Sequence, residues 1–147
     1  QQYDRIFSLN PDFLLPAIVD MRLHLRADGS GQPIDPVQVE NETLAELGMP
    51  EAWDLIMRVT HNFHIFSGGY AAGLYSYLWA DVMAADAVEA FERSPGGLYD
   101  EGTARRWIDQ ILSVGHRVPA DQAFRNFADH APDPVPLQRR FGLQPSA

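Results

Sequence analysis

The chain has 147 residues, of which 20 are acidic and 11 are basic, and its net charge is −9. This charge argues against a nucleic-acid partner, whose phosphates would be repelled, and no apolar run approaches the ~20 residues of a membrane span. The absence of cysteine excludes disulfides, thiolate metal ligands and a cysteine nucleophile, and it fits a reducing compartment.

Apolar residues at steps of three or four predict an all-α chain of about five or six helices. The first helix is expected to begin at Asn10, which can cap it, with Pro11 in its first turn. The apolar face predicted for this helix consists of Leu14, Ile18, Met21 and Leu25. A break is predicted at 28–33, and no stretch alternates apolar and polar residues long enough for a strand.

Two more helical stretches are expected before a glycine pair. The first runs from about Pro36 to Leu47, and Gly48 ends it. The next periodic stretch opens at Pro50 and continues to the glycines at 68–69. Its predicted apolar face consists of Trp53, Ile56, Met57 and Phe63.

The longest predicted helix runs from about Tyr70 to Arg93, where several alanines raise the helix propensity. Two further helices are expected over 103–114 and 119–130. The inward-facing residues predicted for them are Trp107, Ile108, Ile111 and Leu112 in the first, and Phe124 and Phe127 in the second. The proline-rich tail over 131–147 is predicted to be irregular, with at most a short turn near 137–141.

Two histidines offer the start of a metal site. His61 and His64 are three residues apart and would be neighbours on a helix. A zinc site needs three or four ligands, however, and the sequence contains no H-E-x-x-H and no second paired motif. The residues therefore favour two ordinary histidines, and we predict no metal ligands in this chain.

Two tyrosines are the more informative candidates. Tyr70 and Tyr77 are seven residues apart, about two helical turns, and would share one helix face. Two phenols there can donate hydrogen bonds to a carbonyl oxygen that gains negative charge during acyl transfer. Core or interface aromatics are the alternative, which the residues alone favour. Gly68 and Gly69 lack the lysine of a phosphate loop and predict a mobile loop.

Residues 63–80 spell FHIFSGGYAAGLYSYLWA. This segment resembles the HIFxGGYAAGYYxYLW motif of the thimet oligopeptidase (M3) family of zinc peptidases, and it is nearest to the branch of bacterial oligopeptidase A and peptidyl-dipeptidase. The similarity continues to Gly142-Leu143, and upstream the stretch DMRLH at 20–24 resembles the family's DMRxH. The resemblance covers nearly the whole chain and implies a mostly helical, two-lobed enzyme with a deep channel for short peptides.

The same resemblance implies which parts are missing. In the family, a zinc-bound water attacks the peptide bond, and the zinc ligands come from an H-E-x-x-H helix and a glutamate on a following helix. Both precede the matched region, so we expect a C-terminal fragment, cut at Gln1 from a longer cytoplasmic or periplasmic parent. Zinc is expected in that parent and none in this chain, which alone should be inactive. The expected partners are short peptides, the missing N-terminal part and, through exposed apolar faces, further copies of the fragment.

Site residues are carried over one by one from the motif. His64 matches a histidine at the start of the mobile loop that contacts the substrate, and Gly68 and Gly69 match flexible glycines of that loop. Tyr70 and Tyr77 match two tyrosines that reach the substrate near the scissile carbonyl. The resemblance implies that Tyr77 stabilises the oxyanion and that Tyr70 helps to bind the substrate.

One departure from the motif leaves other interpretations open. Leu74 stands where the family usually has tyrosine, so a hydroxyl contact is lost there. The expected organisation is scaffold helices at 1–62, a substrate-binding loop and helix at 63–93, and C-terminal helices with a tail at 94–147. The alternatives are a non-catalytic helical binding module on the same scaffold, and a standalone acidic helical protein that pairs with a separate metal-bearing chain.

Overall fold

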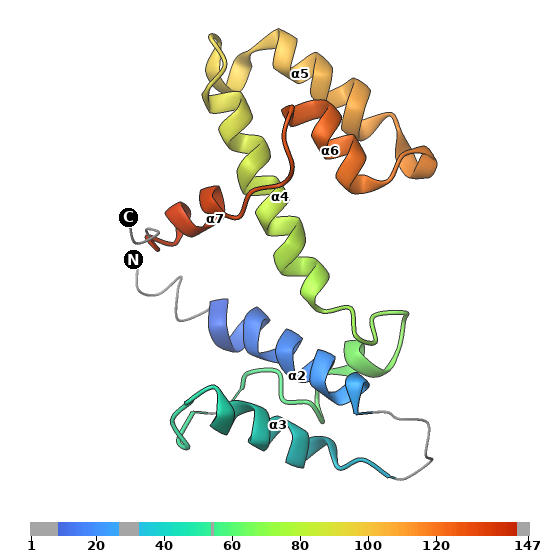
Figure 1. Cartoon of the computed structure of the whole chain (residues 1–147), viewed down its shortest axis with the longest axis vertical. Helices are drawn as coiled ribbons and strands as arrows, with labels where there is room; N and C mark the ends of the chain where they lie inside the picture. Colours follow the sequence, from blue (N-terminus) through green and yellow to red (C-terminus); the bar gives the residue numbers. More distant parts are fainter. Residues whose placement is uncertain (1–8, 27–32, 54, 144–147) are drawn as a thin grey trace. The chain divides into compact units, whose positions relative to one another are not determined.

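The computed structural model describes residues 9–26, 33–53 and 55–143. Its α-helices are α2 (Leu15–Leu25), α3 (Pro36–Glu46), α4 (Tyr75–Glu92), α5 (Glu101–Trp107), α6 (Ala120–Ala128) and α7 (Val135–Arg140) (Figure 1). These described residues contain no strand, so the all-α prediction is confirmed. None of their helices is long and apolar enough to cross a membrane. Most of the predicted break at 28–33 and the end of the tail lie outside the described residues.

The chain divides into two compact units, residues 1–78 and 79–147. In the first unit, a π-helical turn (Asn10–Leu14) leads into α2, which packs against α3 (Figure 1). The capping expected of the Asn10 side chain lies outside the described side chains. The core of this unit consists of Leu15, Val19, Leu23, Val39, Leu55, Val59 and Ile65.

The apolar face predicted for the first helix was wrong. The buried face consists of Leu15, Val19 and Leu23. Of the predicted residues, Met21 is exposed and Leu25 is 76% exposed. The helix is apolar on most sides, so periodicity alone does not select the face. Packing against the rest of the first core makes that selection.

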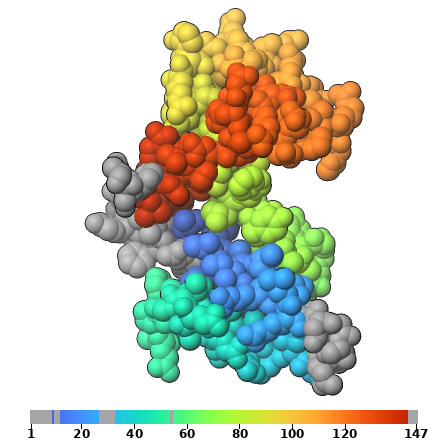
Figure 2. Space-filling view, viewed as in Figure 1, coloured from blue at the N-terminus to red at the C-terminus, as the bar shows by residue number. Residues whose placement is uncertain are grey.

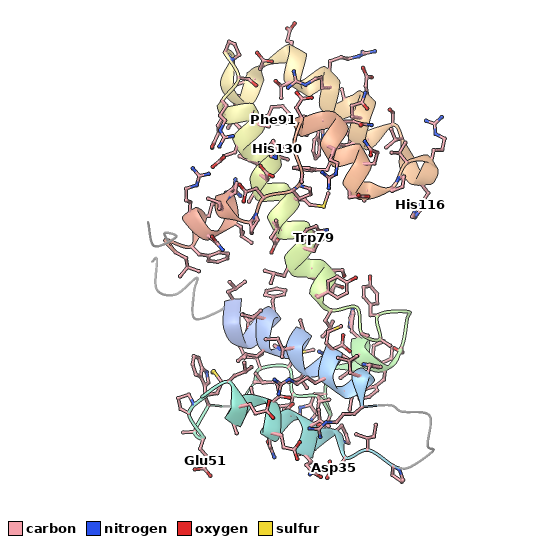
Figure 3. The ribbon with its side chains drawn as sticks, in the orientation of Figure 1. Asp35, Glu51, Trp79, Phe91, His116 and His130 are labelled. Atoms are coloured by element: carbon pink, nitrogen blue, oxygen red, sulfur yellow. The ribbon has the colours of Figure 1, made fainter. Side chains whose placement is uncertain are left out.

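Helix α3 forms where the sequence predicts it. The carboxylate of Asp35, labelled in Figure 3, accepts hydrogen bonds from Val37 N at 2.9 Å and Gln38 N at 3.3 Å. These bonds satisfy two of the backbone amides that a helix start leaves without partners. Beyond the other end, Gly48 adopts a left-handed φ of +70°. The stop expected at Gly48 is present, and the Asp35 cap is a further helix signal that was not predicted.

The periodic stretch predicted from Pro50 is not an α-helix. Its described residues form turns and one 3₁₀ helix (Phe63–Phe66). Ile56, Met57 and Phe63 of the predicted face are exposed. The buried carboxylate of Glu40 instead accepts hydrogen bonds from Val59 N at 2.6 Å and from the Arg58 guanidinium at 2.9 Å. Contacts with α3 thus shape a segment that local periodicity assigned to a helix.

The second unit is built on aromatic residues. Phe124 and Phe127 are its buried anchors, as predicted, and the rings of Trp107 and Phe127 meet edge to face at 5.0 Å. Helix α5 continues into a π-helical turn (Ile108–Leu112), against which α6 packs (Figure 2). Ile108 and Leu112 were predicted to point inward but are exposed. The tail forms α7, a fuller helix than the short turn expected there.

Candidate functional site

Tyr70 and Tyr77 come together without sharing a helix. Helix α4 begins at Tyr75, so the predicted start near Tyr70 was wrong by five residues. The two rings are nevertheless stacked, with centroids 5.9 Å apart and planes within 10°. Tyr70 is 39% exposed and Tyr77 is 40% exposed. The pair is therefore no part of the hydrophobic core.

Tight turns place Tyr70 next to the helix. Gly68 and Gly69 have left-handed φ values of +69° and +78°, which glycine adopts without a steric cost. Gly73 N donates a hydrogen bond to the Tyr70 carbonyl oxygen at 2.7 Å. A Cβ on Gly73 would lie 2.9 Å from that same oxygen. Glycine is thus required for its left-handed φ at 68 and 69 and for lack of space at 73. The mobility of this loop stays a prediction.

His64 lies next to the stacked tyrosines, with its ring tilted by 57° to that of Tyr70. It lies on the 3₁₀ helix Phe63–Phe66 and is exposed, with its ring centroid 5.1 Å from that of Tyr70. We call His64, Tyr70 and Tyr77 the ring cluster. The structure therefore brings together the three predicted side chains that carry polar groups.

The two phenols of the ring cluster interact electrostatically. A hydrogen bond with the Tyr70 side chain raises the pKa of Tyr77 above its ordinary value, and desolvation and charge repulsion from the neighbouring phenol act in the same direction. A tyrosine is already protonated at neutral pH, and the raised pKa of Tyr77 extends the protonated range to higher pH. Its hydroxyl is a hydrogen-bond donor that does not ionise under ordinary conditions.

A pocket of about 180 Å³ opens beside the ring cluster. Its lining consists of Asp12, Phe13, Pro16, Met57, Asn62, His64, Leu74 and Tyr77. One carboxylate oxygen of Asp12 is buried there with no hydrogen-bond partner in the part of the chain that the structure describes. Leu74 contributes apolar wall at the position where the motif has tyrosine. Sequence reasoning missed Asp12 and Asn62, because no local signal links their segments to the tyrosines.

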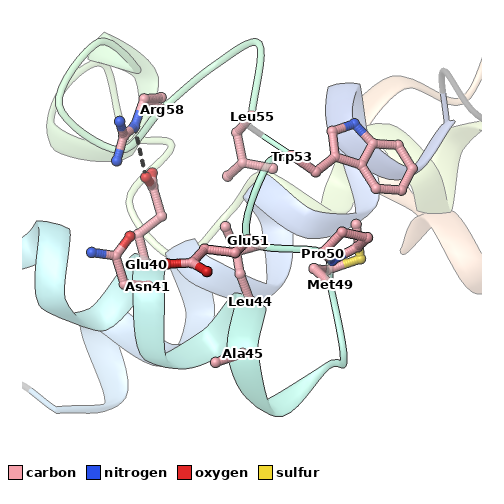
Figure 4. Close-up of a pocket in the computed structure, with 10 residues that line it drawn as sticks. All are labelled: Glu40, Asn41, Leu44, Ala45, Met49, Pro50, Glu51, Trp53, Leu55 and Arg58. Carbon is pink, nitrogen blue, oxygen red and sulfur yellow. Dashed lines mark hydrogen bonds and ion pairs between the residues drawn. The ribbon is translucent and has the colours of Figure 1, made fainter.

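A larger pocket of about 490 Å³ lies against α3 and contains none of the predicted site residues (Figure 4). Its polar wall includes Glu40, whose carboxylate is paired with Arg58. Trp53 and Leu55 provide apolar wall opposite α3. The buried carboxylate of Glu40 already has its partners in Arg58 and Val59 N.

Asp20 is a further residue that was not predicted to belong to the site. Its side chain is 0% exposed, and its two carboxylate oxygens accept hydrogen bonds from Ala72 N at 3.0 Å and Leu74 N at 3.1 Å. His24 Nδ1 lies 3.0 Å from the same carboxylate. The resemblance at 20–24 includes Asp20, but the neighbouring residues give no sign of its hydrogen bonds to residues more than 50 positions away.

The described residues contain no group of three or more histidine, aspartate or glutamate side chains placed to hold a metal ion. His61 and His64 are not on an α-helix, so the helical spacing that paired them does not apply. The residues present therefore do not fit a zinc site.

The chain is similar in sequence to known peptidases. The family model of peptidase family M3 matches residues 5–143. Oligopeptidase A of Escherichia coli K12 is 35% identical over 130 residues, which cover 86% of this chain and 18% of that protein. Organellar oligopeptidase A of Arabidopsis thaliana is 45% identical over 133 residues, or 86% of this chain and 16% of that protein. Dipeptidyl carboxypeptidase of Escherichia coli K12 is 31% identical over 133 residues, or 90% and 19%. The chain spans less than a fifth of these relatives.

Proposed function

Because this chain belongs to peptidase family M3, we propose that it is the C-terminal, substrate-binding part of a zinc-dependent oligopeptidase or peptidyl-dipeptidase acting on short peptides. The observation that carries the proposal is the ring cluster, which brings two partly exposed phenols and an imidazole together beside a pocket. The names of the relatives support peptides as substrates, and their greater length supports a larger parent. The absence of cysteine fits the cytoplasm as the compartment.

In this proposal Tyr77 stabilises the negative charge that develops on the scissile carbonyl oxygen. The phenol carries its proton at neutral pH, so the hydroxyl can donate a hydrogen bond to that oxygen. Tyr70 holds the hydroxyl of Tyr77 while the site is empty, and it helps to bind the substrate once the site is filled. His64 contacts the substrate from the 3₁₀ helix, and Gly68 and Gly69 let the loop adopt its turn.

The zinc used by M3 peptidases belongs to another part of the parent in this proposal. It supplies a polarised water to the reaction, and the described residues of this chain have no cluster that fits it. We therefore expect the isolated chain to bind no catalytic zinc and to cleave no peptide. Stoichiometric zinc together with activity in a metal-analysed sample of the chain would refute this assignment.

The central test is Tyr77→Phe in a full-length peptidase that contains this chain. Loss of one oxyanion donor typically lowers kcat by ~10²–10³-fold, and we expect KM to change far less. Tyr99→Phe is the matched control, because Tyr99 belongs to the other unit and is 93% exposed. A near-wild-type kcat in Tyr77→Phe would exclude the proposed role.

A non-catalytic binding module is the second candidate function. Leu74 in the pocket wall favours it, because a polar group of the motif is absent there. The upstream coding sequence discriminates between the two functions: an H-E-x-x-H before Gln1 supports the peptidase, and an unrelated domain supports the module.

A further inference from the structure

We propose that Asp20 is a positioning residue whose buried carboxylate holds the backbone between Tyr70 and Tyr77. The inference rests on the function proposed above for the two tyrosines. It concerns a residue on α2, which reaches the ring cluster only through the main chain of residues 72–74.

The contacts of Asp20 are those of a long-range cap. Leu74 comes immediately before α4, where backbone amides lack partners inside the helix, and Oδ2 of Asp20 accepts its N–H. A negative charge at this end of a helix is also favourable. Oδ1 accepts the N–H of Ala72, which has a left-handed φ of +55°. A residue with a Cβ keeps such a conformation only where its surroundings fix it.

His24 completes the arrangement around the carboxylate. Its Nδ1 lies 3.0 Å from Oδ1 of Asp20 and 2.8 Å from the Asp20 carbonyl oxygen, one helical turn away on α2. Asp20 thus faces three N–H or ring-nitrogen groups. Each carboxylate oxygen accepts one backbone N–H, so asparagine would place its NH₂ group opposite one of these two donors.

The two anchored residues are linked to the tyrosines by backbone hydrogen bonds, Leu74 directly and Ala72 through the next residue, Gly73. Leu74 carries the carbonyl that accepts the N–H of Tyr77 at 3.3 Å. Ala72 is followed by Gly73, whose N–H donates to the Tyr70 carbonyl oxygen. Releasing the two anchors should therefore loosen both tyrosines and the stack between their rings.

The experiment compares Asp20→Asn, Tyr77→Phe and the double variant in the full-length peptidase. Displacement of a catalytic group by about 1 Å can cost ~10²-fold, so we expect kcat of Asp20→Asn to fall by up to that factor. KM should rise as well, because Tyr70 is loosened together with Tyr77. In the Tyr77→Phe background, Asp20→Asn should cost little more, because both substitutions act through the same phenol. Amide exchange in residues 70–77 should also accelerate.

Asp86→Asn is the matched control. Asp86 is buried in the second unit, accepts a hydrogen bond from Asp133 N at 2.8 Å and faces His130 at 3.7 Å. The same chemical change there should leave kcat and the exchange of residues 70–77 unchanged. A loss of kcat equal to that of Asp20→Asn would mean that any buried carboxylate has this effect, and it would overturn the proposal.

The remaining outcomes separate the two proposals. Wild-type kcat in Asp20→Asn beside an impaired Tyr77→Phe overturns the role of Asp20 alone, and so do fully additive losses in the double variant. Wild-type kcat in Tyr77→Phe overturns the proposed function instead. If Asp20→Asn does not fold, His24→Ala removes one contact and keeps the carboxylate. It should lower kcat to a smaller extent, again only while Tyr77 is present, and an unchanged kcat would overturn the proposal.

Discussion

The two phenols of the ring cluster depend on each other at the scale of single residues. Tyr70→Phe removes the hydroxyl that hydrogen-bonds to Tyr77, so the pKa of Tyr77 should fall back toward the ordinary value of about 10. The folded-state pKa of Tyr77 is raised, so the interaction is complete below pH ~10 and is lost as the pH rises through the folded-state value. Titration of tyrosinate absorbance measures this change.

Tyr99→Phe supplies the reference for that titration. It removes one nearly fully exposed phenol and should leave the late-titrating tyrosine unchanged. An unchanged Tyr77 titration in Tyr70→Phe would show that the hydrogen bond between the phenols is not what raises its pKa.

Resemblance to a motif was sufficient to select the side chains of the ring cluster, whereas spacing was not. The i, i+7 argument put Tyr70 and Tyr77 on one helix, and they stack although only Tyr77 is helical. Asp12 and Asp20 could not be found in this way. Their contribution depends on contacts with segments far along the chain, which no local pattern encodes.

Long-range hydrogen bonds set the limits of the elements. The helix predicted from Tyr70 begins only at Tyr75. Ala72 has a left-handed φ, and the Asp20 carboxylate accepts hydrogen bonds from the backbone N–H groups of residues 72 and 74, so these residues are not helical. In the same way, the Glu40 carboxylate accepts a hydrogen bond from Val59 N, in a stretch whose periodicity predicted a helix. Helices with local caps, such as α3, were predicted well because their start and stop signals lie within the sequence of the element.

Asp100 makes the start of α5 sensitive to acid. Hydrogen bonds from the backbone N–H and side chain of Thr103, with a further one from Gly96 N, lower the pKa of Asp100. Its stabilising effect is present above the unfolded-state pKa of about 3.9 and is lost as the pH falls through the folded-state value. Asp100→Ala should lower the urea midpoint at pH 7 and remove this part of the acid dependence.

Asp100→Asn is the control for charge, because asparagine also caps helices well. It should keep most of the midpoint at pH 7 and still lose the acid dependence. Equal acid dependence in the original chain and in both variants would exclude Asp100 as the titrating group.

Among the described residues, each of the two units has a hydrophobic core of its own. Both units also leave large apolar side chains exposed, among them Leu25, Ile56, Phe63 and Leu112. Such surfaces fit the proposal that further parts of a larger enzyme cover them. Self-association of the isolated chain remains a prediction on the same ground.

Separate cores predict separate responses to core substitution. Phe127 is 0% exposed and packs against the rings of Phe91, Trp107 and Phe124, so Phe127→Ala should cost ~3–5 kcal/mol in the second unit. Amide exchange measured along the chain should show faster exchange in α5 and α6, with α2 and α3 still protected.

Leu112→Ala serves as the control, because Leu112 lies in the same unit but is exposed, and such substitutions change stability by only about 0.5 kcal/mol. Equal loss of protection in α2 and α3 after Phe127→Ala would mean that the chain unfolds as one cooperative body. Retained protection would mean that the first unit, which holds the ring cluster and Asp20, keeps its fold when the second core is damaged.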